Sequence, residues 1–336
     1  MSTHAPVEGR HVAGVVVGLT AALTVVLTAF AWPASQLEPR GVPLALVGPP
    51  GAGDQVAAAL AGSTAPEAFE VTPAESRDAA VTAIADREAY GAIVISPAGT
   101  EMLVASAAGP AVAQMLTGMA EQMAATAGTV PVVTDVVPLP SADPRGVVFG
   151  AGAFPLVVGG IAVGLVLALR VPGRTRQLVT GAGVAVASGL ALAAVQQLWL
   201  EALAGSYWAN AGVYALAIGA MAAVVAGMHH VLGVPGLGLA AATILLLGNP
   251  LSAITSAPEL LPDGWSTLGQ LLPPGAAGSA LRSTAYFDGT AATAPLLVLA
   301  AWLAVGVALA ALPSRQSADR RTASRPGRML EMHQPA

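Results

Sequence analysis

Long apolar stretches bounded by charged residues dominate the pattern of this chain. A helix rises about 1.5 Å per residue, so about 20 apolar residues cross a hydrocarbon core of about 30 Å. Apart from His229-His230, the region between Glu201 and Glu259 carries no charged residue; it is too long for one crossing and divides at that pair. The pattern therefore predicts six membrane-spanning helices, at residues 12–32, 147–169, 177–200, 207–228, 231–247 and 294–312.

The first apolar stretch has an alternative interpretation as a cleaved signal peptide. Ala29-Phe30-Ala31 matches the small-x-small pattern of a cleavage site. The stretch is longer than the roughly 7–15 apolar residues usual in signal peptides, which favours a retained helix.

The distribution of arginine predicts the orientation, because cytoplasmic loops of membrane proteins carry an excess of basic residues. If residues 1–11, 170–176 and 313–336 are cytoplasmic, that side holds nine Arg and three acidic residues, and the other side holds five Arg and sixteen acidic residues. We therefore expect a multi-pass protein of a bacterial cell membrane with both termini in the cytoplasm. The Arg-rich tail, residues 313–336, is expected to lie on anionic membrane lipid.

Residues 33–146, the one long polar segment, alternate short apolar runs with helical patterns. Strands are expected at residues 42–47, 69–71, 92–95, 102–105 and 132–137. Helices are expected at residues 54–60, 73–87 and 110–127, the second with Thr72 as N-cap and Glu75 completing a capping box. Such alternation is typical of α/β domains. The predicted fold is a polytopic α-helical membrane protein with six transmembrane helices and an extracytoplasmic α/β domain inserted between helices 1 and 2.

Residues 248–293 are too polar and proline-rich for another span, yet too apolar for a free loop. Pro273-Pro274 interrupts the segment, and residues 276–286 suggest a short helix. Trp265 and Tyr286 favour the headgroup level of a membrane. We expect short helices that re-enter the outer leaflet beside the spans, with an ordinary structured outer loop as the alternative.

Several kinds of chemistry are excluded by the residues themselves. Cys is absent, which excludes disulfides, Cys-ligated zinc and iron–sulfur clusters. Residues 48–53 follow a strand and precede a helix, as a P-loop does, but Asp54 and Gln55 stand where that motif requires Lys and Ser or Thr. We expect no catalytic, cofactor or metal site, no enzyme activity of the chain's own and no nucleic-acid partner.

Two stretches of sequence carry a family resemblance. The first, Ser76 to Ser96, ends in Tyr90-Gly91-Ala92-Ile93-Val94-Ile95-Ser96. The second runs from Gly248-Asn249-Pro250 through Leu272-Pro273-Pro274-Gly275-Ala276 to Tyr286-Phe287. With one span before and five after the α/β segment, the chain resembles the type-2 ABC exporter permeases, most closely the phage-infection-protein (YhgE/Pip-like) branch.

The resemblance implies six spans per subunit, a second permease subunit in a homo- or heterodimer, and a separate P-loop ATPase subunit in the cytoplasm. It also implies that the loop between spans two and three contacts the ATPase. In this chain that loop is residues 170–176, so Arg170, Arg174 and Arg176 are the candidate contacts. Simple positive-inside anchoring is the alternative role for these side chains.

Polar residues near the end of span three are candidates for a substrate path, because polar groups in lipid are costly and often functional. Gln197 and Glu201 are spaced i, i+4, which predicts one helix face. A place at the membrane interface, satisfied by water or headgroups, is the alternative for both. The pairs Gly14-x-x-x-Gly18 and Gly160-x-x-x-Gly164 each permit close helix packing.

The leading functional hypothesis is an export permease subunit driven by a separate ATPase. The spans carry few charges, so an apolar or amphipathic substrate is expected. The alternative is a non-transporting membrane scaffold or receptor whose outer domain binds an envelope or secretion partner. A proton-coupled transporter is third, since it requires Asp, Glu or His within the spans, where such residues are almost absent.

Overall fold

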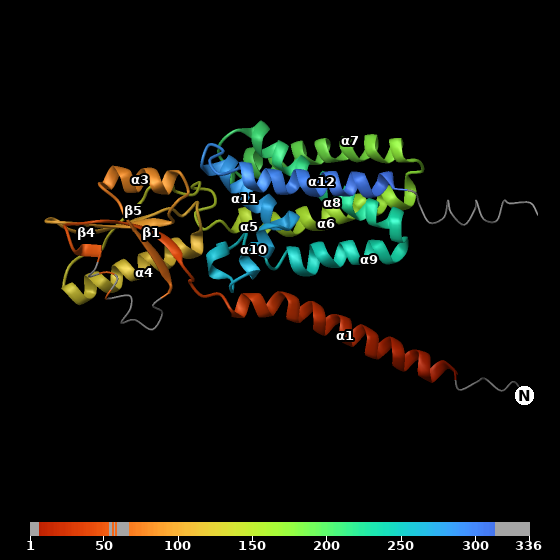
Figure 1. The fold of residues 1–336 in the computed structure, drawn as a ribbon, viewed down its shortest axis with the longest axis horizontal. Helices are drawn as coiled ribbons and strands as arrows, with labels where there is room; N and C mark the ends of the chain where they lie inside the picture. Colours follow the sequence, from red (N-terminus) through yellow and green to blue (C-terminus); the bar gives the residue numbers. More distant parts are fainter. Residues whose placement is uncertain (1–6, 54–55, 57, 59–66, 313–336) are drawn as a thin grey trace, which may run out of the picture.

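The computed structural model describes residues 7–53, 56, 58 and 67–312. Helix α1 (Val7–Ser35) leads into an α/β domain, which docks on one end of a helical bundle (Figure 1). Below, this end of the bundle is the junction end, and the other is the opposite end.

A five-stranded mixed sheet forms the centre of the α/β domain. Its strands have the order β2-β1-β3-β4-β5, with β3 and β4 antiparallel and the other three neighbouring pairs parallel. The strands are β1 (Val42–Val47), β2 (Phe69–Pro73), β3 (Gly91–Ser96), β4 (Gly99–Val104) and β5 (Val132–Asp135).

Helices α3 (Arg77–Ala85) and α4 (Pro110–Ala127) cover opposite faces of the sheet (Figure 1). Successive side chains of a strand point to opposite faces. Leu44 accordingly joins the cluster under α4, whereas Ala45 joins the cluster under α3. The predicted α/β alternation of this segment therefore forms a three-layer arrangement.

The predicted start of the second helix of this domain was wrong. The prediction placed the N-cap at Thr72, but Thr72 and Pro73 belong to β2 and pair with Ala45 and Leu46. The observed N-cap is Ser76, whose Oγ accepts a hydrogen bond from the Ala79 amide at 3.1 Å. The helix expected at residues 54–60 lies largely outside the described residues.

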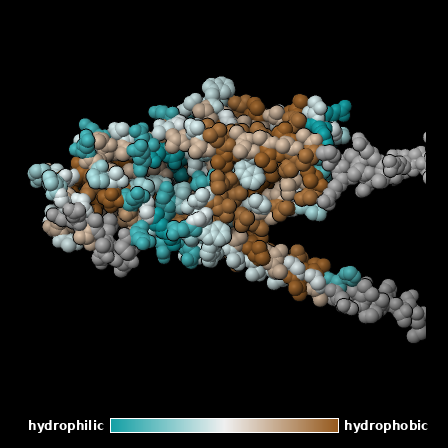
Figure 2. All heavy atoms as spheres, viewed as in Figure 1, coloured by the Kyte–Doolittle hydropathy of each residue, from teal (hydrophilic) through white to brown (hydrophobic). Residues whose placement is uncertain are grey.

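Among the described residues, five helical segments are long and apolar enough to cross a membrane, which makes this a helical protein of membrane-embedded type. They are His11–Ser35, Val147–Arg170, Arg174–Trp199, Tyr207–Leu232 and Thr293–Ala311. The second comprises α5 (Val147–Ala151) and α6 (Ala153–Arg170), and the third comprises α7 (Arg174–Ala193) and the π-helix η1 (Ala194–Trp199). Figure 2 shows apolar side chains gathered over the bundle and α1, and hydrophilic ones over the α/β domain and the junction.

Helix α8 (Tyr207–Leu232) is the centre of the bundle and the most buried of the five. Small residues let its neighbours approach closely. A Cβ on Gly160 or Gly164 of α6 would lie within 3 Å of α8 side chains, at 2.9 Å from the Cβ of Met221 and 2.6 Å from the Cβ of Val225. The second of the two predicted glycine motifs is therefore a packing surface within the subunit.

The fifth predicted span, residues 231–247, is shorter than expected. Helix α9 (Val234–Ala242) continues into the π-helix η2 (Thr243–Gly248), nine and six residues. At about 1.5 Å per residue this segment is about 22 Å long, less than the hydrocarbon thickness of a membrane. The structure thus has five helices of crossing length among the described residues rather than the six expected.

The segment after η2 folds back into the junction end of the bundle. It contains the 3-10 turn η3 (Pro258–Leu260), α10 (Trp265–Gln270) and α11 (Pro273–Tyr286). Twelve of the fourteen residues of α11 are buried, and the helix lies against α8 and α12 (Thr293–Ala311). Pro273-Pro274 therefore opens a buried helix as well as ending α10.

Helix α1 lies away from the bundle along most of its length (Figure 1). In the described part of the chain, no atom beyond the helix's own backbone lies within 4 Å of a Cβ placed on Gly14 or Gly18. At its C-terminal end, the rings of Trp32 and Trp265 meet edge to face, with centroids 5.2 Å apart.

Candidate functional site

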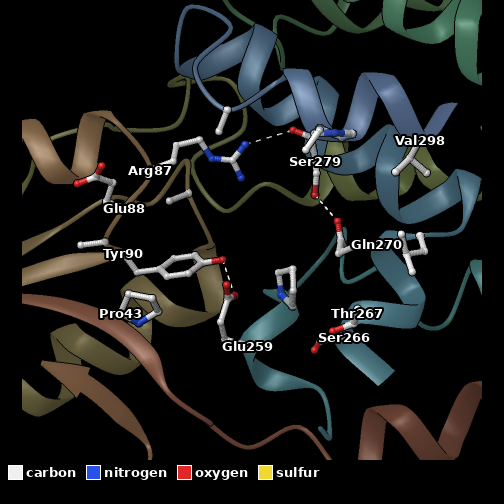
Figure 3. A pocket seen from close by; sticks show the side chains of 17 residues that line it. Pro43, Arg87, Glu88, Tyr90, Glu259, Ser266, Thr267, Gln270, Ser279 and Val298 are labelled. Carbon is white, nitrogen blue, oxygen red and sulfur yellow. Dashed lines mark hydrogen bonds between the residues drawn. The ribbon is translucent and has the colours of Figure 1, made fainter. Parts of the chain in front are cut away.

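A cleft of about 520 Å³ lies where the α/β domain meets the bundle. The turn after α3, residues 87–90, forms one wall (Figure 3). Parts of η3, α10, α11 and the first turns of α12 form the other. The cleft therefore joins segments that lie far apart in the sequence.

Arg87 reaches across the cleft from the α/β domain to α11. It follows the C-cap of α3 and has a positive φ of 62°, which turns the chain toward β3. Its Nη1 donates to the Ser279 carbonyl oxygen at 3.3 Å and to the Ser283 hydroxyl, and its guanidinium lies 5.3 Å from the centre of the Phe287 ring. Burial lowers the pKa of Arg87, but a guanidinium stays charged at any physiological pH.

Tyr90 and Glu259 meet at the same cleft (Figure 3). The Tyr90 hydroxyl donates to Oε2 of Glu259 at 2.6 Å. Burial is the main cause that raises the pKa of Tyr90, and the Glu259 charge adds to it. The phenol therefore keeps its proton and remains a hydrogen-bond donor over the physiological pH range.

The backbone around Glu259 is fixed to the extended segment that joins α1 to β1. The Arg40 amide donates to the Glu259 carbonyl at 3.0 Å, and the Glu38 amide donates to the Leu260 carbonyl at 3.0 Å. Arg40 Nη1 also donates to the Leu260 carbonyl, at 3.1 Å. This pairing holds η3 against the α/β domain and so positions the Glu259 side chain.

Among the residues that the structure describes, neither Arg87 nor Glu259 has an oppositely charged partner within ion-pair distance. Within the described part of the chain, the ion pairs are Arg40–Glu38 and Arg77–Glu101. A third charge, Arg282 of α11, is buried behind the cleft, where Nη2 donates to the Ile254 carbonyl at 2.8 Å and the guanidinium lies over the Phe149 ring. The junction thus holds opposite charges satisfied mainly by neutral groups.

The cleft changes character toward α12. Ser279 Oγ donates to Gln270 Oε1 at 2.6 Å, while Leu271, Pro295 and Val298 supply an apolar wall. Leu271 is also anchored to α12, because Trp302 Nε1 donates to its carbonyl at 2.8 Å. Polar and charged groups on one side therefore face apolar groups beside a membrane-type helix on the other.

Gln197, one of the two substrate-path candidates, lies in a polar network inside the bundle. Its Nε2 donates to the Gly205 carbonyl and its Oε1 accepts from Asn210 Nδ2, each at 2.9 Å. Asn210 Oδ1 in turn accepts from Thr284 Oγ1 of α11 at 2.7 Å. The network joins η1, α8 and α11, and its groups satisfy one another.

Glu201, the other candidate, does not share a helix face with Gln197 as expected. The π-helix η1 ends at Trp199, and Glu201 has a φ of 51° and is exposed. The i, i+4 argument fails here because the helix ends between the two residues. Neither residue lines the junction cleft.

The three candidate ATPase-contact arginines lie at the opposite end of the bundle. Arg170 ends α6, Arg174 begins α7, and Arg176 is exposed in its first turn. The structure does not bring the three together on one partner. Gln177 Nε2 donates to the carbonyls of Leu167 and Val171, which holds the loop against the end of α6.

Arg174 differs from its neighbours in the loop because it binds the ends of two other helices. Its guanidinium donates to the Ala311 carbonyl at 3.1 Å and to the Leu312 carbonyl at the end of α12, and Nη2 lies 3.0 Å from His230 Nε2 of α8. Cations are favoured at helix C-termini, where carbonyl groups lack partners within the helix. We call the side chains of Arg174 and His230, with the carbonyl groups of Ala311 and Leu312, the α12 latch.

The residues that line the cleft were not among the sequence candidates. Arg87, Glu259 and Ser279 lie far apart in the sequence, and no motif groups them. The available signal was weak: Tyr90 and the segment around Glu259 fall within or beside the stretches that carry the family resemblance. Comparisons with protein-family models, with curated proteins and with solved structures found no match to this chain.

Proposed function

We propose that this chain is the membrane-spanning permease subunit of an ABC-type exporter, driven by a P-loop ATPase on a separate chain. The observation that supports this best is the course of α12. Its first turns line the junction cleft through Pro295 and Val298, and its last carbonyls are bound by Arg174 of the 170–176 loop. One helix therefore connects the loop with the cleft.

The α12 latch gives the loop a means to act on the bundle. Arg174 also meets His230 at the end of α8, the central helix. An ATPase that moves the loop would displace the ends of α8 and α12 together. Since packed helices shift as stiff bodies, the displacement would reach the cleft and change its opening.

The proposal includes a topology of six crossings with both termini in the cytoplasm. The short α9–η2 segment would be completed at the outer side by α10 and α11, which fold back beside it. Gly248 at the end of η2 lies against Pro274 of α11, where a Cβ would be 2.8 Å from Pro274 Cγ. The α/β domain would then be extracytoplasmic, and a second permease subunit would complete the transporter.

Co-purification with an ATPase tests the proposal. The chain would be purified in mild detergent from its native host, and proteins recovered with it would be quantified by mass spectrometry. We expect a P-loop ATPase at near-equal amount, lost when Arg170, Arg174 and Arg176 are all changed to Ala. Arg145→Ala, an exposed arginine at the junction end, is the control and should retain the ATPase.

A scaffold or receptor is the second candidate, and one surface favours it. Val130, just before the edge strand β5, and Val132, its first residue, are 82% and 52% exposed on the α/β domain. Exposed apolar groups at a sheet edge are suited to partner binding. Recovery of an envelope or secretion protein without any ATPase would support this function and contradict the exporter.

A further inference from the structure

We propose that the junction cleft binds a zwitterionic amphiphile, a lipid whose head carries a phosphate and an ammonium group. The binding claim stands on the chemistry of the cleft alone. That this lipid is the transported substrate rests on the proposed function.

The charged groups of the cleft supply one partner for each charge of such a head. Arg87 uses Nη1 for its bonds to Ser279 and Ser283, and its Nε and Nη2 have no hydrogen-bond partner among the described residues. These N–H groups suit a phosphate, which accepts several guanidinium hydrogen bonds. Oε1 of Glu259 likewise has no donor in the described chain, because Tyr90 uses Oε2, and it suits an ammonium group.

The two charges balance, which selects against a purely anionic head. Arg87 and Glu259 enter the cleft from opposite walls (Figure 3). Neither is paired with an opposite charge among the described side chains. A head with one charge of each sign would neutralise both, whereas an anion would face the Glu259 carboxylate. Ser266, Thr267 and Gln270 add neutral hydrogen-bonding groups at the base of the cleft.

The apolar wall leads away from the head toward the bundle surface. Pro295 and Val298 of α12 share a helix face with Val305, which lies seven residues beyond Val298 and is 50% exposed. A hydrocarbon chain would lie along this face and remain in the membrane. The volume of about 520 Å³ suits a phospholipid head and the first carbons of its chains rather than a whole lipid.

Photolabelling of the full chain tests the proposal without any ATPase. The chain would be placed in phosphatidylglycerol nanodiscs with a small fraction of phosphatidylethanolamine carrying a photoactivatable acyl chain. The comparison probe is phosphatidylglycerol with the same acyl chain. We expect the first probe to label peptides of α10 and the start of α12 about tenfold more than the second.

Variants with matched controls distinguish recognition of the lipid head from binding of the lipid tail. Arg87→Gln and Glu259→Gln should each remove most of the preference, whereas Arg77→Gln, at the start of α3 and outside the cleft, should leave it unchanged. Val298→Trp should block labelling, and Leu297→Trp, on the exposed side of α12, should not. Because Val298 takes no part in the polar contacts, its variant stays informative if the charge variants fail to fold.

Two results would overturn the proposal. One is equal labelling by both probes, which would mean ordinary contact with surrounding lipid. The other is competition by soluble phosphoethanolamine at the concentration of the lipid probe, which would mean that the tail contributes nothing. Neither result would affect the co-purification of an ATPase. Failure of the lipid-binding proposal is therefore distinguishable from failure of the exporter proposal.

Discussion

The hydroxyl of Tyr90 and the carboxylate of Glu259 meet at 2.6 Å although 169 residues separate them in the sequence. Tyr90 directly precedes β3 of the α/β domain, and Glu259 lies in η3 of the junction segment. This hydrogen bond, with Arg87 bound to α11, fixes the domain on the bundle. These contacts fix the relative position of the two walls that form the junction cleft.

Removing the Tyr90 hydroxyl should loosen this junction. Tyr90→Phe leaves a half-buried carboxylate without its donor, and a hydrogen bond to a charged group is worth about 1.5–3 kcal/mol. We expect a loss of this size in unfolding by SDS in mixed micelles, with faster hydrogen exchange at residues 38–42. In the Glu259→Gln background the same change should cost less; an equal cost would show that the two groups are not coupled.

The two glycine motifs should respond differently to the same substitution. A Cβ on Gly164 would lie 2.6 Å from the Cβ of Val225 and 2.8 Å from the Ala222 carbonyl oxygen. A Cβ on Gly18 would have no such neighbour within 4 Å among the described residues. Gly164→Val should therefore cost about 1–3 kcal/mol of stability by overpacking, and Gly18→Val about zero. Thermal unfolding in detergent would measure both. A large effect at Gly18 instead would show that α1 packs on a partner there.

Acid should weaken the α/β domain through Glu101. Arg77 binds both carboxylate oxygens at 2.9 Å, and this hydrogen bonding holds the pKa of Glu101 at about 2, below its ordinary value near 4.5. A lowered pKa in the folded state stabilises the fold above about pH 4.5, and the contribution is lost as the pH falls toward 2. Glu101→Gln should unfold more readily at pH 7 and match the unsubstituted chain near pH 2. Glu121→Gln, exposed on α4, is the control and should match it at both.

Cysteine scanning can test the topology directly, because the chain contains no Cys. Single cysteines would replace the exposed residues Ser141, Thr175 and Asp263, and a membrane-impermeant maleimide would be added to right-side-out vesicles. We expect labelling at positions 141 and 263, and at position 175 only after permeabilisation. Labelling of position 263 together with position 175 would contradict the outer location of the junction segment.

The parts of this fold that were predictable depend on local signals. Charged residues bracket the predicted membrane-spanning helices. For this reason the end of α6 at Arg170 and the start of α7 at Arg174 lie within three residues of the predicted bounds. Helix α4 was predicted at its observed bounds, Pro110–Ala127, because Pro can open a helix and Gly128 ends this one in a left-handed conformation.

The remaining parts depend on contacts between distant segments. Helix α11 is rich in Ala, Gly and Ser, so its sequence does not reveal that it is buried against α8 and α12. The cleft residues Arg87 and Glu259 come together only when the domain docks. Glu201 was misplaced because the π-helix before it shifts the helical register and the chain turns at a positive φ.

The most direct test of the exporter account is the ATP hydrolysis of the purified assembly in lipid nanodiscs, compared between Arg174→Gln and Arg176→Gln. Both residues lie in the first turn of α7, but of the two only Arg174 belongs to the α12 latch. The account predicts a co-purified ATPase whose hydrolysis rate falls about tenfold in Arg174→Gln and stays unchanged in Arg176→Gln. Equal rates in both variants, or a preparation that contains no ATPase, would contradict it.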